Sequence, residues 1–210
     1  MTTARAGLKI HVVSALLYGP VHGFMVWNAF LAAVPAALAL LLFQRLERLT
    51  VAWWLGVGAW VLFLPNAPYV LTDVMHMVDD VRDAPTRLRA YEVLGCYGIF
   101  FVAGLVSYVL SLQLFRRFMH RVAPSRMVAP IMLALHGLCV VAMYLGRFLR
   151  LNSWDAVVAP RAVAAAVLRV PRPSTVVLLA AMFVVVGAGA FATAAVGEKL
   201  VAQLRRLVAR

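Results

Sequence analysis

Long apolar runs constrain the fold of this chain more than any other feature of its sequence. Residues 93–115 and 176–196 are two such runs, and each offers the roughly 20 apolar residues that a helix needs to cross a bilayer. Hydrophobic residues form 64% of the chain and charged residues only 13%, which excludes a water-soluble globule. The runs are too uniformly apolar for the alternating strands of a membrane barrel. We therefore predict an all-α polytopic transmembrane helix bundle, a single integral-membrane domain over residues 1–210.

We predict about six spans, with five as the alternative. The alternative arises from residues 8–43, which are too long for one ordinary span and short for two. Pro20, between Gly19 and Gly23, favours a tight turn between two helices there, and the first apolar stretch is interpreted as an uncleaved anchor. The further spans are expected over residues 51–64, 93–115, from near 130 to about 145, and 176–196.

The basic residues gather between the predicted spans and at the C-terminus, and the formal net charge is +12. This pattern favours contact with anionic lipid headgroups over nucleic-acid binding. With six spans, most Lys and Arg residues share the side of both termini, so we expect a multi-pass protein of the cell (inner) membrane with cytoplasmic termini. Residues 198–210 predict a cationic amphipathic tail on the lipid surface. The expected partners are membrane lipids, and a second copy of the chain or another membrane protein.

A polar motif interrupts the third predicted span. Residues 51–64 form a helix of only about 21 Å at about 1.5 Å per residue, short of the roughly 30 Å of hydrocarbon, before Pro65–Pro68 break it. We expect the break inside the membrane, toward its far side, where irregular backbone survives only beside protein or a water-filled cavity. The motif therefore predicts an outward-facing polar pocket. Its candidate ligand-binding residues are Asn66, Tyr69, Thr72, Asp73 and His76.

A second polar motif, residues 146–155, ends the fifth predicted span. Its candidate ligand-binding residues are Arg147, Arg150, Asn152, Trp154 and Asp155. The two arginines are three residues apart and are expected to share a helix face. Both motifs lie on the same membrane face with five or six spans, and isolated charges near hydrocarbon are costly. We therefore expect Asp73 to pair with Arg147 or Arg150. The competing interpretation is that the arginines reach headgroups and Trp154 joins the interfacial aromatic belt.

Asp73 and His76 are the only candidates for catalysis, because they share a helix face and could act as an acid–base pair. With Asp80 one turn further they could also bind a divalent metal, but the spacing matches no strong metal signature, and we predict no metal site and no cofactor. Thr72 or Asp73 could instead cap a short helix, and Asn66 could satisfy the broken backbone. Nucleophile elbows, Walker loops, dinucleotide fingerprints and zincin motifs are absent from the sequence.

Other polar residues in the apolar segments are expected to serve packing. His22, Asn28 and His136 favour interhelical hydrogen bonds over ligand contacts. Cys96 and Cys139 form no CxxC spacing and are interpreted as small buried side chains.

The two polar motifs resemble those of a known family. FLPNAPYVLTDVMH (63–76), together with LGRFLRLNSWD (145–155), is similar to the prokaryotic membrane family catalogued as domain of unknown function 1361. The resemblance covers roughly residues 27–196. It implies a small multi-pass inner-membrane protein with both motifs as family hallmarks, and it brings no established reaction.

Three kinds of function fit these features. A binding or transport protein would hold a small or lipid-linked ligand in the pocket, since broken helices mark such sites in transporters. A membrane-embedded enzyme would hold a lipid phosphate with the arginines and move protons with Asp73 and His76. A non-catalytic accessory subunit would use both motifs only to lock helices together. The sequence favours a membrane protein with an outward-facing polar pocket and does not decide among the three.

Overall fold

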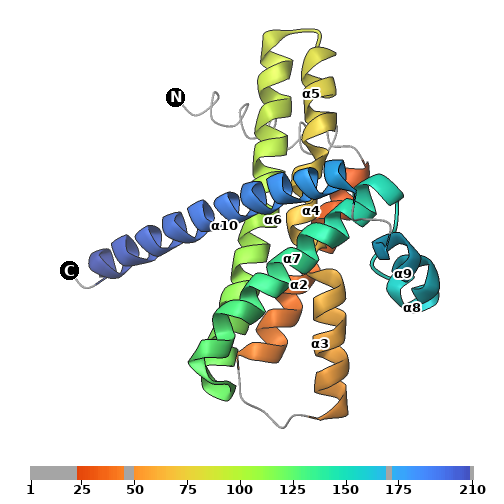
Figure 1. Cartoon of the computed structure of the whole chain (residues 1–210). Coiled ribbons are helices and arrows are strands. Elements are labelled where there is room, and N and C mark those ends of the chain that lie inside the picture. The colour runs from red at the N-terminus through yellow and green to blue at the C-terminus, as the bar shows by residue number, and fades with distance from the viewer. Residues whose placement is uncertain (1–22, 45–49, 169–171, 209–210) are drawn as a thin grey trace.

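The computed structural model describes residues 23–44, 50–168 and 172–208. Within these ranges the chain is almost entirely helical and contains no β-strand (Figure 1). Five helices of the described part are long and apolar enough to cross a membrane, counting the broken helix Val51–Arg82 as one. The predicted all-α membrane class is confirmed. The first predicted span and the turn at Pro20 lie outside the described residues, so a sixth span stays a prediction.

The elements follow one another through short connections. They are α2 (Gly23–Phe43), α3 (Val51–Phe63), α4 (Asn66–Tyr69), the 3₁₀ turn η1 (Val70–Asp73), α5 (Val74–Arg82), α6 (Arg87–Val122), α7 (Ser125–Leu149), α8 (Asp155–Val158), α9 (Pro160–Leu168) and α10 (Pro173–Val208). The helices α6 and α7 extend beyond the apolar stretches that predicted them. The charged residues 78–92 are non-helical only over 83–86, because helical hydrogen bonding continues through charged residues once a helix has begun.

The third predicted span is interrupted where the prolines fall. Pro65 and Pro68 have no N–H to donate, so the regular helical ladder fails there. The carbonyl of Leu64 accepts instead from the N–H of Ala67 at 3.2 Å, and the carbonyl of Pro65 accepts from the N–H of Tyr69 at 3.1 Å. After the break the chain forms two short turns, α4 and η1, each with its own backbone hydrogen bonds. The regular helix α5 begins after them.

Helix α6 is the central element of the fold, and α2 packs along it in parallel (Figure 1). The Ser107 hydroxyl of α6 donates to the carbonyl of Ala32, and the Arg121 guanidinium donates to the carbonyl of Phe43 at 2.7 Å. Phe43 also meets the buried ring of Trp60 on α3 edge to face, with centroids 5.0 Å apart. These contacts hold α2, α3 and α6 together below the broken segment.

The broken segment reaches the core because α6 presents a glycine to it. A Cβ on Gly104 would lie 2.5 Å from the carbonyl oxygen of Ala67 and would collide with the side chain of Val70. Ala67 and Val70 are both fully buried. Gly104 lies at the centre of the apolar stretch 93–115 of α6. The break is therefore level with the middle of that stretch, and its depth in a membrane stays a prediction.

Helices α7 and α10 complete the bundle. Helix α7 packs against α6 and α4, and α10 crosses both α6 and α7 before its C-terminal half extends away from them (Figure 1). The expected last span 176–196 and the described part of the following tail, to Val208, form one continuous helix. Along the described part of the tail, Leu200, Leu204 and Leu207 remain exposed. Contact of this tail with lipid stays a prediction.

We predict that Gly104→Ala destabilises the protein even though alanine favours helix. Overpacking of this kind costs about 1–3 kcal/mol, and the carbonyl of Ala67 is backbone that cannot rotate away. The matched control is Gly98→Ala on the same helix, where a Cβ meets nothing within 4 Å. Thermal unfolding in detergent, followed by size exclusion, should give a lower midpoint for Gly104→Ala only. Equal midpoints for the two variants would contradict the close approach.

Candidate functional site

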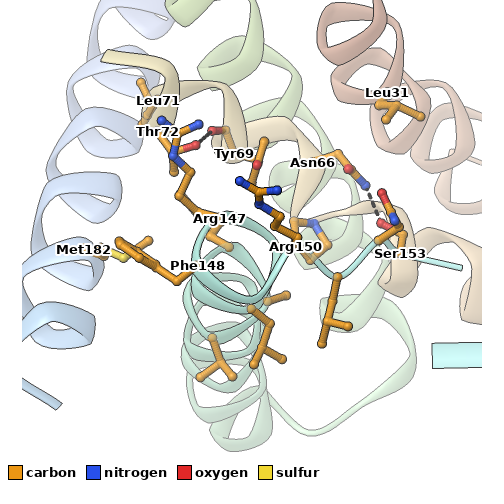
Figure 2. Close-up of a pocket in the computed structure, with 18 of the residues that line it drawn as sticks. Leu31, Asn66, Tyr69, Leu71, Thr72, Arg147, Phe148, Arg150, Ser153 and Met182 are labelled. Atoms are coloured by element: carbon orange, nitrogen blue, oxygen red, sulfur yellow. Dashed lines mark hydrogen bonds between the residues drawn. The ribbon is translucent and has the colours of Figure 1, made fainter. Parts of the chain in front are cut away.

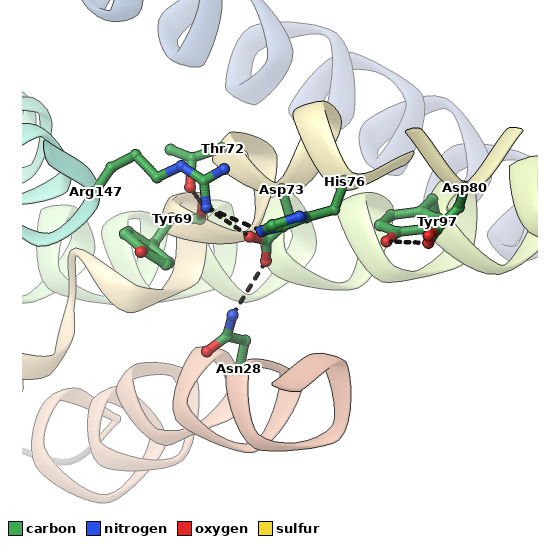
Figure 3. Close-up of polar contacts among 8 residues, drawn as sticks. All are labelled: Asn28, Tyr69, Thr72, Asp73, His76, Asp80, Tyr97 and Arg147. Atoms are coloured by element: carbon green, nitrogen blue, oxygen red, sulfur yellow. Dashed lines mark hydrogen bonds and ion pairs between the residues drawn. The ribbon is translucent and has the colours of Figure 1, made fainter. Parts of the chain in front are cut away.

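The buried carboxylate of Asp73 joins three parts of the fold (Figure 3). Its side chain lies at the end of η1 and the residue is only 2% exposed. Oδ2 accepts a hydrogen bond from Nδ2 of Asn28 on α2 at 3.0 Å, and Oδ1 pairs with the guanidinium of Arg147 on α7 at 3.3 Å. The expected ion pair between the two motifs is therefore present, with Arg147 as the partner. Asn28 makes the interhelical hydrogen bond expected of it.

His76 lies one turn beyond Asp73, at an exposed position of α5. Its Nε2 atom is 3.4 Å from Nη1 of Arg147. Because a guanidinium only donates hydrogen bonds, this contact requires the unprotonated Nε2 atom. The carboxylate of Asp80, one turn further along α5, accepts a hydrogen bond from the Tyr97 hydroxyl at 2.8 Å (Figure 3). Among the described residues, no group of three or more His, Cys, Asp and Glu side chains could hold a metal ion.

Two side chains of the first motif satisfy the interrupted backbone. Nδ2 of Asn66 donates to the carbonyl of Phe63 at 3.0 Å and to the hydroxyl of Ser153 at 2.8 Å. The Thr72 hydroxyl donates to the carbonyl of Tyr69 at 2.8 Å. Of the alternatives that the sequence left open, Asn66 does bridge the break, whereas the start of α5 has no side-chain cap.

The second motif leaves the helix earlier than expected. Arg150 has the left-handed backbone angles φ 55° and ψ 33° that end α7. The expectation that Arg147 and Arg150 share a helix face is therefore wrong, because Arg150 lies outside the helix. The turn that follows is closed by Asp155, whose Oδ2 accepts the backbone N–H of Asn152 at 2.6 Å. Trp154 is 44% exposed just before α8.

The two motifs line one cavity of about 1100 Å³ (Figure 2). It lies between the α4–η1–α5 path, the end of α7, and the parts of α9 and α10 that face them. The candidates that line it are Asn66, Tyr69, Thr72, His76, Arg147, Arg150, Asn152 and Trp154. Asp73 and Asp155 do not line the cavity. They hold its walls, Asp73 through Arg147 and Asp155 through the turn that follows α7.

The sequence did not reveal the apolar part of this cavity. Helix α10 contributes Ala181, Met182 and Val185, and α7 contributes Leu138 and Val141. Every apolar span offers such side chains at helical spacing, so no signal marks the ones that face a cavity. Ser153 was also missed, although its place between two candidates of the second motif could have indicated it.

The remaining polar residues have the packing roles expected of them. Nδ1 of His136 lies 2.7 Å from the Tyr108 hydroxyl of α6, and Nε2 lies 3.0 Å from the carbonyl of Phe183 on α10. These bonds tie α7 to both neighbours. Cys139 is buried and Cys96 half-buried, and both are free thiols. His22 lies outside the described residues.

Comparison with known proteins identifies the family. The chain belongs to the family described as "Protein of unknown function (DUF1361)", which matches residues 27–188. The match includes both polar motifs and every residue that lines the cavity. No curated protein and no solved structure matches the chain.

We predict that Asp73→Asn lowers stability because it leaves the Arg147 guanidinium without its carboxylate. Removing one partner of a buried pair costs about 3–5 kcal/mol. Arg147→Gln should also destabilise, while the double variant should be more stable than the sum of the two losses implies. Midpoints of thermal unfolding in detergent supply the double-mutant cycle.

The control for this cycle is Arg82→Gln. Nη1 of Arg82 lies 3.9 Å from Oδ1 of Asp79, and the two side chains are 75% and 68% exposed. Loss of this exposed ion pair in Arg82→Gln should lower the free energy of unfolding by less than about 1 kcal/mol. Strictly additive losses at Asp73 and Arg147 would show that the pair contributes no coupling.

Proposed function

We propose that this member of the DUF1361 family binds an amphiphilic anion, a lipid or lipid-linked molecule, in the cavity between its two polar motifs. The composition of the cavity wall carries the proposal. One end holds the guanidinium groups of Arg147 and Arg150 and no carboxylate from the described residues, while α7 and α10 supply an apolar wall. A ligand that fits both parts has an anionic head and an apolar chain.

The size of the cavity supports a ligand of this class. Its volume of about 1100 Å³ is slightly above the roughly 300–1,000 Å³ of typical small-molecule sites. A small polar solute would leave most of the apolar wall in contact with water, which is unfavourable. An acyl or isoprenoid chain would cover that wall.

The depth of the cavity supports access from the bilayer. The broken segment lies against Gly104, at the centre of the apolar stretch of α6. Interrupted backbone is tolerated at such depth where it is buried in protein or lines a cavity. With six spans, the distribution of Lys and Arg favours cytoplasmic termini for this membrane protein.

The geometry supports binding more directly than proton transfer by Asp73. That carboxylate is held by Asn28 and Arg147 and does not line the cavity, so it supports the wall and does not face a ligand. His76 does line the cavity. Of the two candidates for catalysis, it is therefore the one that would lie beside a ligand. Transport and catalysis would both begin with the binding step proposed here.

We predict that filling the apolar wall blocks binding. Ala181→Trp places an indole in the cavity, whereas Ala180→Trp puts the same side chain on an adjacent, exposed residue that does not line it. Native mass spectrometry in neutral detergent should detect lysophosphatidylglycerol bound to the unmodified chain. The affinity should fall by roughly tenfold or more, about 1.4 kcal/mol, in Ala181→Trp only.

Lipids that co-purify with the unmodified chain provide a second measurement. They should be anionic and should be depleted from purified Ala181→Trp but not from Ala180→Trp. Equal affinities and equal lipid content in the two variants would show that the ligand does not occupy this cavity.

A further inference from the structure

Arg150 occupies a backbone conformation that its side chain disfavours. It is the one non-glycine residue with positive φ in the described part of the chain. Helices commonly end on such a left-handed residue, but glycine or asparagine usually fills the position, because a Cβ crowds the following carbonyl. The N–H groups of Arg150 and Leu151 both bond to the carbonyl of Leu145, the latter at 3.3 Å. The helix ending itself needs no arginine side chain.

The two arginines of the cavity have different surroundings. Arg147 is half-buried and its charge is balanced by the Asp73 carboxylate at 3.3 Å. Arg150 is exposed, and no carboxylate of the described residues lies within ion-pair distance of it. Both side chains extend from the end of α7 toward the α4–η1 segment (Figure 2). The pair Asp73–Arg147 is electrically neutral, so the net positive charge of the cavity belongs to Arg150.

We propose that Arg150 is the residue that binds the anionic group of the ligand, and that Arg147 is a positioning residue that holds the wall through Asp73. This inference rests on the proposed function and names the atoms that select the head of the ligand. A single uncompensated guanidinium matches a singly charged oxyanion, such as a phosphodiester or a carboxylate, through charge-assisted hydrogen bonds. The left-handed backbone at this position places that guanidinium at the cavity.

An arginine at the end of a helix has an ordinary alternative role, since cations there interact favourably with the last carbonyls. The two roles predict opposite effects on stability. If Arg150 serves the helix end, its replacement destabilises the protein. If it serves the ligand, replacement by a residue suited to positive φ relieves strain.

The experiment compares Arg150→Gly and Arg150→Asn with the unmodified full chain in neutral detergent. Arg126→Gln, which removes a cation from the other end of α7, is the control. Native mass spectrometry measures the affinity for lysophosphatidylglycerol, which is singly negative, and for lysophosphatidylcholine with the same acyl chain, which is neutral overall. Thermal unfolding without added lipid measures the stability of each variant.

We expect the unmodified chain and Arg126→Gln to prefer lysophosphatidylglycerol at least tenfold. Both Arg150 variants should lose that preference, keep their affinity for lysophosphatidylcholine, and unfold at the same or a higher temperature. An unchanged preference in the Arg150 variants, or a lower unfolding temperature with the preference intact, would overturn the role of Arg150. Cavity binding would still stand if Ala181→Trp blocks both lipids.

Inorganic phosphate distinguishes the possible sources of the anion. Displacement of lysophosphatidylglycerol by phosphate in the unmodified chain supports an Arg150 site that also takes a free anion. A preference that depends on Arg150 and resists phosphate supports a lipid headgroup held together with its chain. If neither lipid binds the unmodified chain, both the proposed function and this inference fail.

Discussion

The constraint on which this structure depends is that an interrupted helix among apolar surroundings must satisfy its own polar groups. Where Pro65 and Pro68 remove two N–H donors, the Asn66 amide reaches the carbonyl of Phe63 and the Thr72 hydroxyl reaches the carbonyl of Tyr69. An unsatisfied group in hydrocarbon costs several kcal/mol. The motif therefore carries its polar residues first to stabilise its own backbone. Its contribution to the cavity wall follows from that arrangement.

The Asp73–Arg147 pair satisfies buried polar groups between helices, as Asn66 and Thr72 do within the broken segment. Asp73 is bonded to α2 through Asn28 and to α7 through Arg147, so the distance between these helices at the cavity is set by one carboxylate. Gly104 determines how closely the broken segment approaches α6, because only a residue without a Cβ lets the two lie against each other. The cavity is thus held from three directions by contacts that need no ligand, which is the preorganisation that favours selective binding.

The sequence predicted those features that follow from local rules. Hydropathy and length predicted the helices, proline chemistry predicted the break, and the cost of an isolated charge predicted a partner for Asp73. It could not predict which arginine would be that partner, because the end of α7 depends on a left-handed backbone at Arg150 that this residue type rarely adopts. It could not place α10 either, since apolar helices carry no pattern that specifies which neighbours they cross.

The depth of the break changes how a ligand would reach the site. The short length of α3 alone predicts that Pro65–Pro68 lie inside the membrane, toward its far side. The structure shows that α5 continues the path for a further turn and more, and that the break lies against the middle of the apolar stretch of α6. The cavity has apolar side chains of α7, α9 and α10 in its wall, and under our proposal it takes a molecule that is already dissolved in the bilayer. Its charged head would then need a compensating cation, and the guanidinium of Arg150, which lines the same cavity, is the one that we propose.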